Sequence, residues 1–281
     1  MSKLYVIGTP IGNLGDFSPR GLQSLRDCDF IAAEDTRVTA KLLHHFGISK
    51  PMVSYHEHNR RACGQKIAAR LLAGETCALV TDAGMPAISD PGEDLVALCH
   101  DSGIPVEAVP GPTAFATALA ISGFPSGRFT FEGFLSVNKR GRAEHLNALA
   151  SETRTMIFYE APHKLPHTLC DFALRFGERS LAIVRELTKI HEQVIRTTCC
   201  EANERYGKDN PDAIQLKGEI VLILAGAPVA DIQETPLEDA IALAQEYIGQ
   251  GMSQGESAKR AAKETGRRRN EIYAKLVKIG D

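Results

Sequence analysis

The 281-residue sequence predicts two α/β domains followed by a small helical extension. Three observations support this class. Short apolar runs alternate with helical patterns in residues 1–122, a second group of such runs fills residues 123–230, and residues 231–281 contain no strand pattern. Because strands that alternate with helices make right-handed crossovers, we expect a mainly parallel sheet in the first domain.

In the first domain, four apolar runs predict buried strands at Leu4–Ile7, Phe30–Ala33, Cys77–Val80 and Val106–Val109. Apolar residues at helical spacing predict helices at Pro19–Arg26, Thr36–Phe46, Arg60–Leu72 and Pro91–His100. Ser18 and Asp90 each precede a proline, which suits the first helical position. We therefore expect both side chains to cap the helices that follow.

The second domain begins after the Gly- and Pro-containing break at Gly123–Gly127. Strands are predicted at Phe129–Phe134, Thr155–Tyr159, Leu181–Val184, Val194–Thr197 and Glu219–Leu224. Helices are predicted at Ala143–Ala150 and Leu165–Phe176. Since two strands follow each other closely near residues 181–197, we expect antiparallel pairing there and a mixed sheet.

The extension is predicted to form three short helices. Thr235–Glu238 has a helix-start pattern, Ser253 and Glu256 have the spacing of a capping box, and glycines at 249–251 and 266 mark the breaks. Between residues 257 and 278, eight Lys or Arg oppose two Glu, a balance of +6, whereas the whole chain carries −3. This asymmetry favours an anionic partner over the alternative of a solvated helix face.

The cysteine, histidine and apolar patterns exclude several classes of protein. Seven cysteines without a CxxC spacing argue against a disulfide framework and a zinc ribbon, and favour reduced thiols in a cytosolic protein. The histidines at 44–45 and 56–58 match no zinc signature, so we expect no metal. No secretory signal is visible, and the apolar runs are too short to cross a bilayer.

Three loop motifs follow predicted strands of the first domain: GTPIGNL at Gly8–Leu14, TDAGMPAISDPG at Thr81–Gly92, and PGPTA at Pro110–Ala114. Parallel sheets bind ligands at the carboxyl ends of their strands. The exposed backbone of such loops can bind a nucleoside cofactor, although no dinucleotide or P-loop motif is present. Each motif also has a structural alternative: a tight strand–helix turn for the first, a capped turn ahead of a helix for the second, and close helix–sheet packing for the third.

Together with three further segments, these motifs resemble the tetrapyrrole methylase family over nearly the whole chain. The further segments are AEDTR at Ala33–Arg37, FYEAPHK at Phe158–Lys164 and RELTKIHE at Arg185–Glu192. The resemblance implies two α/β domains with S-adenosylmethionine in the cleft between them, and a homodimer. Cofactor contacts of the family fall on Pro10, Ile11, Asp82, Ala83, Gly84, Met85, Ile88, Thr113, Ala114 and Glu160.

The substrate is also implied by resemblance. Many family members have an acidic residue in the first loop and GDP in the second, where this chain has Asn13 and Gly84-Met85-Pro86. This departure argues against a tetrapyrrole substrate. Within the family, the match is closest to members that methylate the 2′-oxygen of a cytidine ribose in the decoding region of 16S rRNA, as part of the small ribosomal subunit.

Methyl transfer to a ribose hydroxyl needs positioning and a group that accepts the hydroxyl proton. Four candidates stand near the ends of predicted strands: Glu34, Asp35, Glu186 and Lys189. The alternative for each is a structural ion-pair network between the domains. For RNA, phosphate contacts are expected from Arg37 and from the run Arg267, Arg268 and Arg269, with a second basic edge at His56–Arg61.

Two other functions remain open. One is an enzyme of the same fold that acts on a small molecule or a protein; the basic extension argues against it, because such substrates need no cationic surface. The other is a non-enzymatic RNA-binding module. The glycine-rich loops after the first-domain strands argue against that function, since a module that only binds RNA does not need them.

Overall fold

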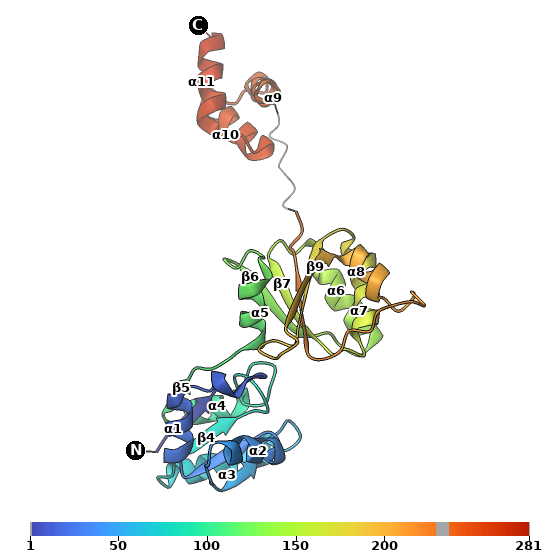
Figure 1. Cartoon of the computed structure of the whole chain (residues 1–281). Coiled ribbons are helices and arrows are strands. Elements are labelled where there is room, and N and C mark those ends of the chain that lie inside the picture. The colour runs from blue at the N-terminus through green and yellow to red at the C-terminus, as the bar shows by residue number, and fades with distance from the viewer. Residues whose placement is uncertain (1, 229–235, 281) are drawn as a thin grey trace. The chain divides into compact units, whose positions relative to one another are not determined.

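A computed structural model describes residues 2–228 and 236–280 of the chain (Figure 1). The chain divides into two compact units, residues 1–227 and 228–281. The first unit contains two five-stranded sheets, which confirms the predicted fold class. The predicted boundary at residues 230/231 lies outside the described residues, and the division of the first unit at residue 122 remains a prediction.

The first sheet is entirely parallel, with the order β3-β2-β4-β1-β5. Its strands are β1 (Leu4–Ile7), β2 (Phe30–Ala33), β3 (Met52–Ser54), β4 (Cys77–Val80) and β5 (Val106–Val109). The four predicted strands are confirmed with their bounds. The sequence did not predict β3, because three half-exposed or exposed residues make no apolar run. In this order β1 lies between β4 and β5, so the three loop motifs, which follow these three strands, are neighbours.

Helices cover both faces of the first sheet, which explains why its strands are continuous apolar runs. On one face, α3 (Arg60–Leu72) and α4 (Glu93–Asp101) pack against β1, β2 and β4. On the other face, α1 (Pro19–Asp27) and α2 (Thr36–His45) pack against alternate residues of the same strands. A short 3-10 helix, Leu14–Asp16, follows the first loop motif.

The two predicted helix caps have different outcomes. Ser18 caps α1 as predicted, since its hydroxyl accepts a hydrogen bond of 3.0 Å from the Gly21 amide. The prediction for Asp90 is wrong, because α4 begins at Glu93 with Gly92 in the capping position. Ala87 and Ser89 have φ values of 68° and 61°, so the chain makes a strained turn before the helix. The Asp90 side chain therefore does not cap the helix.

The second sheet is mixed, as predicted, with the order β6-β7-β10-β8-β9. Only β6 and β7 pair in parallel. Its strands are β6 (Phe129–Phe134), β7 (Thr155–Glu160), β8 (Ser180–Arg185), β9 (Gln193–Thr198) and β10 (Ile220–Leu224). The sequence placed each of these strands to within one residue at each end.

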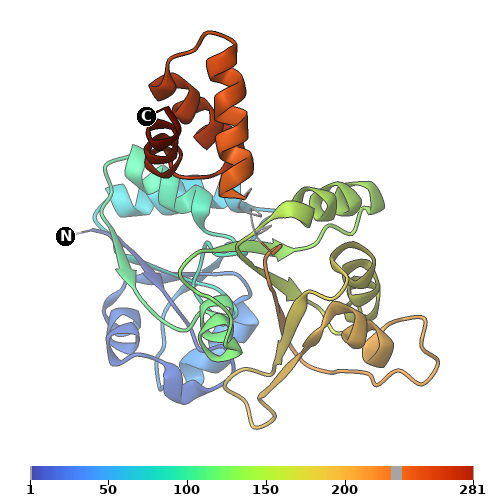
Figure 2. The same cartoon turned by 90° about the horizontal axis from the view of Figure 1, so that it is seen from above.

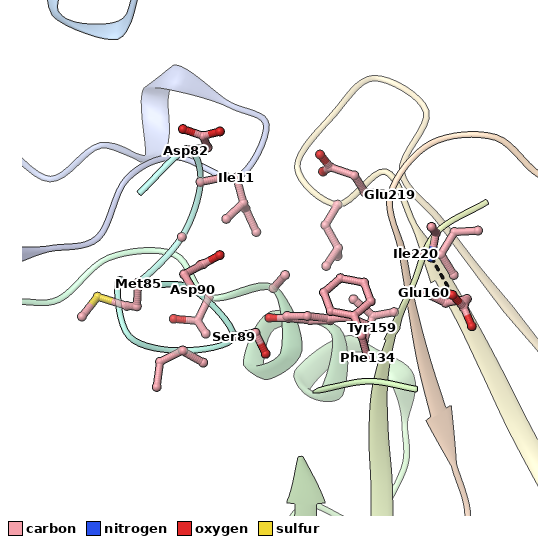
Figure 3. A pocket seen from close by; sticks show the side chains of 18 of the residues that line it. Ile11, Asp82, Met85, Ser89, Asp90, Phe134, Tyr159, Glu160, Glu219 and Ile220 are labelled. Atoms are coloured by element: carbon pink, nitrogen blue, oxygen red, sulfur yellow. Dashed lines mark hydrogen bonds between the residues drawn. The ribbon is translucent and has the colours of Figure 1, made fainter. Parts of the chain in front are cut away.

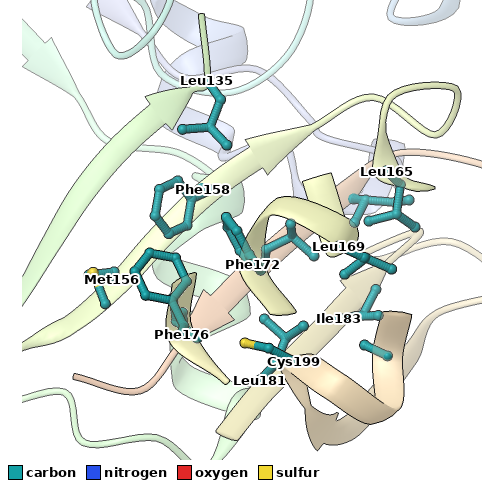
Figure 4. Packing of buried hydrophobic residues seen from close by; sticks show 14 of the residues in the cluster. Leu135, Met156, Phe158, Leu165, Leu169, Phe172, Phe176, Leu181, Ile183 and Cys199 are labelled. Carbon is teal, nitrogen blue, oxygen red and sulfur yellow. The ribbon is translucent and has the colours of Figure 1, made fainter. Parts of the chain in front are cut away.

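Helices α6 (Lys139–Ala148), α7 (Leu165–Phe176) and α8 (Cys199–Tyr206) belong to this half of the unit. Phe172 of α7 packs on Phe158 of β7, with ring centroids 5.1 Å apart, inside the cluster shown in Figure 4. The helix α6 begins earlier than predicted because Asn138 caps it. The unpredicted α8 carries a capping box of Thr198 and Glu201, a signal that the sequence offered.

The opposite face of the second sheet packs against α5 (Ala114–Ser122). Ala118 and Leu119 of this helix join a buried cluster with Ile157, Ala182 and Ile223. The small side chains of α5 thus allow the helix to pack closely against the second sheet, whose strands follow it in the chain. Ile11 of the first loop belongs to the same cluster, so the first loop motif contacts the second sheet as well.

The second unit consists of α9 (Leu237–Gly249), α10 (Gln254–Thr265) and α11 (Arg269–Gly280), which confirms the three predicted helices (Figures 1 and 2). They pack around a small core of alanines with Ile272 and Leu276. The capping box of Ser253 and Glu256 is confirmed, whereas Thr235 lies outside the described residues. No helix within residues 2–228 and 236–280 is long and apolar enough to span a membrane.

Candidate functional site

A cavity of about 470 Å³ opens in the first unit at the carboxyl ends of the parallel strands (Figure 3). Loops of the first sheet line one side, and residues of the second sheet line the opposite side. The lining consists of Ile11, Glu34, Asp82, Ala83, Gly84, Met85, Ile88, Ser89, Asp90, Thr113, Ala114, Phe134, Tyr159, Glu160, Ala161, Pro162, Leu187, Glu219, Ile220 and Val221. The three loop motifs therefore meet in one site.

Backbone contacts hold the three loops together. The amides of Thr9 and Gly84 donate hydrogen bonds to each other's carbonyl oxygens, at 2.9 and 3.1 Å. The Thr9 hydroxyl also donates to the Thr81 carbonyl oxygen at 3.2 Å. A Cβ added at Gly8 would lie 2.7 Å from Gly111 Cα, and one at Gly111 would lie 2.6 Å from the Gly8 oxygen. Glycine at both positions therefore allows the first and third loops to approach each other closely.

The first loop also contacts the segment that follows β8. A Cβ added at Gly12 would lie 2.7 Å from Lys189 Cγ and 2.9 Å from the Leu187 carbonyl oxygen. In this segment Glu186 and Thr188 have positive φ values of 52° and 64°, which is unusual for residues with side chains. Such strain persists only where the surroundings fix the backbone, and it is concentrated at functional sites.

Glu186 and Lys189 form an ion pair beside the cavity and do not line it. Glu186 Oε1 accepts hydrogen bonds from Lys189 Nζ at 2.9 Å and from the Glu219 amide at 3.0 Å. The hydrogen bond from Lys189 holds the pKa of Glu186 below its usual value. Lys189 Nζ also donates to Glu219 Oε2 at 3.2 Å. The pair therefore fixes the position of Glu219, which does line the cavity.

Three carboxylates of the first sheet line the cavity: Glu34 after β2, and Asp82 and Asp90 after β4. Glu34 accepts a weak hydrogen bond from the Asp82 amide at 3.4 Å, and Asp82 accepts one from the Asp35 amide at 3.2 Å. Burial raises the pKa of both side chains. Asp90 has no hydrogen bond or ion pair within the described part of the chain. Burial, with the nearby charges of Glu34 and Asp82, raises the pKa of Asp90 to about 7.

Asp35 and Arg37 pair with each other at the start of α2. Asp35 accepts a hydrogen bond from the Arg37 amide and forms a bidentate ion pair with its guanidinium, at 2.6 to 3.2 Å. The hydrogen bonds from Arg37 hold the pKa of Asp35 at about 2. A carboxylate with this pKa is a weak base near neutral pH.

The end of β7 supplies the opposite wall. Glu160 is only 5% exposed and accepts hydrogen bonds from the Ala161 amide, at 2.8 Å, and from the Thr168 hydroxyl. The Tyr159 hydroxyl accepts a hydrogen bond of 3.2 Å from the Phe115 amide in the first turn of α5. Figure 3 shows the rings of Tyr159 and Phe134 beside each other, and their centroids are 5.5 Å apart. This wall is aromatic and tightly held.

A second cavity, of about 480 Å³, shares Glu34, Ser89 and Asp90 with the first. Its other lining residues come mainly from the segment after β3 and the start of α4. They are His56, Glu57, His58, Arg60, Ala87, Pro91 and Glu93. Among the described residues, no group of three or more His, Cys, Asp or Glu is arranged to hold a metal ion.

The cavity unites most of the residues expected to bind a cofactor. All of them except Pro10 line it. Of the four proton-acceptor candidates, only Glu34 lines it. Asp35 pairs with Arg37, and Glu186 pairs with Lys189; both are local ion pairs and not a network between the predicted domains. The three consecutive arginines lie in the second unit: Arg267 and Arg268 stand between α10 and α11, and Arg269 begins α11.

Sequence reasoning missed half of the lining. Asp90 was assigned to a helix cap, although it belongs to the second loop motif. Glu219, Ile220 and Val221 come from the start of β10, which carries no motif, whereas Leu187 lies in the RELTKIHE segment but was not singled out. The signal for Glu219 was a charged residue at the start of an otherwise continuous apolar run. Only the topology of the second sheet shows that this end of β10 reaches the cavity.

A sequence model described as Tetrapyrrole (Corrin/Porphyrin) Methylases matches residues 3–203. The chain belongs to this family. Among solved structures of the same fold is uroporphyrin-III C-methyltransferase from Thermus thermophilus in complex with S-adenosylhomocysteine. Its TM-score is 0.53 at 17% identity, over 79% of this chain and 97% of that protein. At this identity the likeness shows the fold alone.

Relatives of this methylase family are much closer in sequence. The chain is 46% identical over 277 residues to "Ribosomal RNA small subunit methyltransferase I" of Synechocystis sp., covering 97% of this chain and 96% of the relative. It is 45% identical over 272 residues to the protein of the same name from Xylella fastidiosa, covering 96% and 97%. These matches extend beyond the family model into the basic helical unit.

Proposed function

We propose that this methylase transfers a methyl group from S-adenosylmethionine to the 2′-oxygen of a cytidine ribose in the decoding region of 16S rRNA. The observation that carries the proposal is the match to ribosomal RNA small subunit methyltransferases I over nearly the full length of both chains. The conserved family fold and the cavity at the carboxyl ends of its parallel strands support a methyl-donor site.

The lining of the first cavity fits the donor. A volume of about 470 Å³ is within the range of small-molecule sites. Ile11, Met85 and Leu187 offer apolar surface for the adenosine, and the nearby carboxylates favour a cationic sulfonium. Structural complexes of a distant protein of this fold contain S-adenosylhomocysteine, which is the product of such a donor.

When bound, the donor supplies a methyl group on a positively charged sulfur. The loops of the first sheet would orient it, and the aromatic wall of Tyr159 and Phe134 would exclude water from it. Alignment of the attacking oxygen with the methyl group should provide much of the rate acceleration. The remaining requirement is a group that accepts the hydroxyl proton.

The second unit would supply the RNA contacts. Its lysines and arginines give residues 257–278 a balance of +6, and phosphate neutralisation provides affinity without sequence information. The expected homodimer and the recognition of an assembled small subunit are part of the same proposal. So is a location in the cytoplasm, where a ribosomal substrate would be met.

Mass spectrometry of 16S rRNA from cells that lack this protein tests the proposal. We expect the loss of one 2′-O-methylcytidine, which returns when the gene is restored. An unchanged set of ribose methylations would contradict it. Calorimetry with S-adenosylmethionine separates the remaining functions, because a module that only binds RNA would show no affinity for the donor.

A further inference from the structure

The second cavity has the features of a ligand site that the methyl donor does not explain. It is as large as the first cavity and meets it at Glu34, Ser89 and Asp90. His56 and His58 line it, with ring centroids 5.9 Å apart. His56 Nδ1 is buried and has no hydrogen-bond partner among the described residues. An unsatisfied buried nitrogen is costly, and a bound ligand can satisfy it.

The charges that line the second cavity indicate what kind of ligand it receives. Glu34, Glu57 and Glu93 supply carboxylates, which can accept hydrogen bonds, whereas Arg60 already pairs with Asp94 at 3.0 Å. A surface rich in carboxylates repels a phosphate but accepts hydrogen bonds from hydroxyl and amino groups. Imidazole rings can stack on a base. The sugar and base of a single unstacked nucleotide fit this lining, with the phosphates left outside.

Asp90 lines both cavities, and none of the residues that the structure describes forms a hydrogen bond or an ion pair with its side chain. It follows two residues of positive φ, Ala87 and Ser89, and does not cap α4. Glu34 and Asp82 each accept a hydrogen bond from a backbone amide, and Glu186 is paired with Lys189. Glu34 and Asp90 are the carboxylates that line both cavities; Glu34 already accepts a hydrogen bond from the Asp82 amide, whereas neither oxygen of Asp90 accepts one within residues 2–228 and 236–280.

We propose that the second cavity holds the acceptor nucleotide and that Asp90 accepts the proton of its ribose hydroxyl. This inference rests on the proposed function and names the acceptor site within it. The hydroxyl oxygen forms a bond to the methyl carbon while the carbon–sulfur bond breaks and its electron pair remains on sulfur. The hydroxyl proton passes to an Asp90 oxygen and is later released to water.

The surroundings of Asp90 suit this role near neutral pH. From the first sheet, the charges of Glu34 and Asp82 face it, and from the second sheet the hydroxyl of Tyr159 lies near it. On the side of the second cavity, the charged or titratable groups are His56, Glu57, His58, Arg60 and Glu93. With a pKa of about 7, Asp90 can both accept a proton and release it.

The test compares Asp90→Asn with Asp101→Asn, an equivalent change at the exposed end of α4. Single-turnover methylation of small-subunit rRNA should fall about 10²- to 10⁴-fold in Asp90→Asn and stay unchanged in Asp101→Asn. The wild-type rate should rise with pH through about 7 and then level, because the carboxylate form is the active one. The residual rate of Asp90→Asn should not show this rise with pH.

Calorimetry supplies a readout that is independent of turnover. Affinity for S-adenosylmethionine should change less than about threefold in Asp90→Asn, since the proposed role is toward the acceptor. A rate within tenfold of the wild type, or a loss of donor binding, would overturn the role of Asp90. A wild-type protein that binds the donor but methylates no rRNA would instead contradict the proposed function, so the two failures can be distinguished.

A second substitution tests the cavity itself. His56→Ala should raise the KM for small-subunit rRNA at least fivefold without changing the affinity for the donor, because it removes a base-stacking ring. The control is His100→Ala, which changes an exposed histidine of α4. An unchanged KM in His56→Ala, with the control also unchanged, would exclude the second cavity as the acceptor site.

Discussion

The two units of this methylase differ in the size of their cores and in the charges that they present. Residues 1–227 bury four apolar clusters around two sheets and gather carboxylates at a cavity. In the second unit, the described residues 236–280 form three helices around a small, alanine-rich core and present most of their lysines and arginines to solvent. The comparison suggests that the donor and the acceptor nucleotide are bound by the first unit and the RNA phosphates by the second, so mutations should affect donor binding and phosphate binding separately.

In the first unit, the largest effect on donor binding is expected from Gly111→Ala. The added Cβ would lie 2.6 Å from the Gly8 oxygen, so the first and third loops must separate. We expect a loss of about 1–3 kcal/mol in the free energy of unfolding and at least a tenfold loss in donor affinity. Gly127→Ala is the control, because its Cβ meets nothing within 4 Å. Equal donor affinities in the two variants, measured by calorimetry, would contradict the packing role of Gly111.

For the second unit, the corresponding change replaces Arg267, Arg268 and Arg269 with Gln. The slope of log affinity against log salt should decrease in magnitude by about 2 to 3, whereas donor affinity should stay the same. Replacement of all three by Lys retains the charge and serves as the control. If RNA binding by the Gln variant kept the wild-type salt slope, the second unit would not be the phosphate-binding element.

A smaller effect is expected from Lys189→Gln, which removes the cation between Glu186 and Glu219. The pKa of Glu186 should rise toward its ordinary value, because the hydrogen bond from Lys189 that lowers it is lost. We expect methylation to fall about three- to tenfold through disorder of Glu219. Lys208→Gln breaks an exposed ion pair with Asp209 and should change nothing. A loss of more than about 10²-fold in Lys189→Gln would favour a direct catalytic role for Lys189.

The smallest effect concerns stability. The pKa of Asp90 is about 7 in the fold and about 3.9 in an unfolded chain, so the folded state loses stability as pH rises between these values. Asp90→Asn should therefore stabilise the protein at pH 8, by about 1–2 kcal/mol once solvent screening is included, and by less at pH 5. Thermal unfolding at both pH values measures this, and a variant less stable than the wild type at pH 8 would contradict the raised pKa.

The sequence predicted the first sheet well because its strands are buried on both faces. Leu4–Ile7 and Cys77–Val80 are unbroken apolar runs bounded by polar residues, so the pattern alone sets their ends. The short strand Met52–Ser54 lacks such a run, and only its backbone pairing with β2 defines it. Helix α8 was missed although Thr198 and Glu201 have the spacing of a capping box.

Site residues were predicted where motifs follow parallel strands. They were missed where only tertiary contacts bring a residue to the cavity. Gly84 and Thr113 were found because their loops follow β4 and β5, which flank β1. Asp90 was misassigned because the proline pattern fits a helix cap, whereas the positive φ values of the preceding residues shift the helix start to Glu93. The pairing of Glu186 with Lys189 depends on the approach of Gly218 and Glu219, which local sequence does not show.

The central claim is that the first cavity is the methyl-donor site. A crystal structure of the full chain with S-adenosylmethionine tests it most directly. We expect density for the donor between the loops of Ile11, Gly84 and Thr113 on one side and Tyr159 on the other, with its methyl group directed toward Asp90. Donor density at another site, with this cavity empty, would contradict the account.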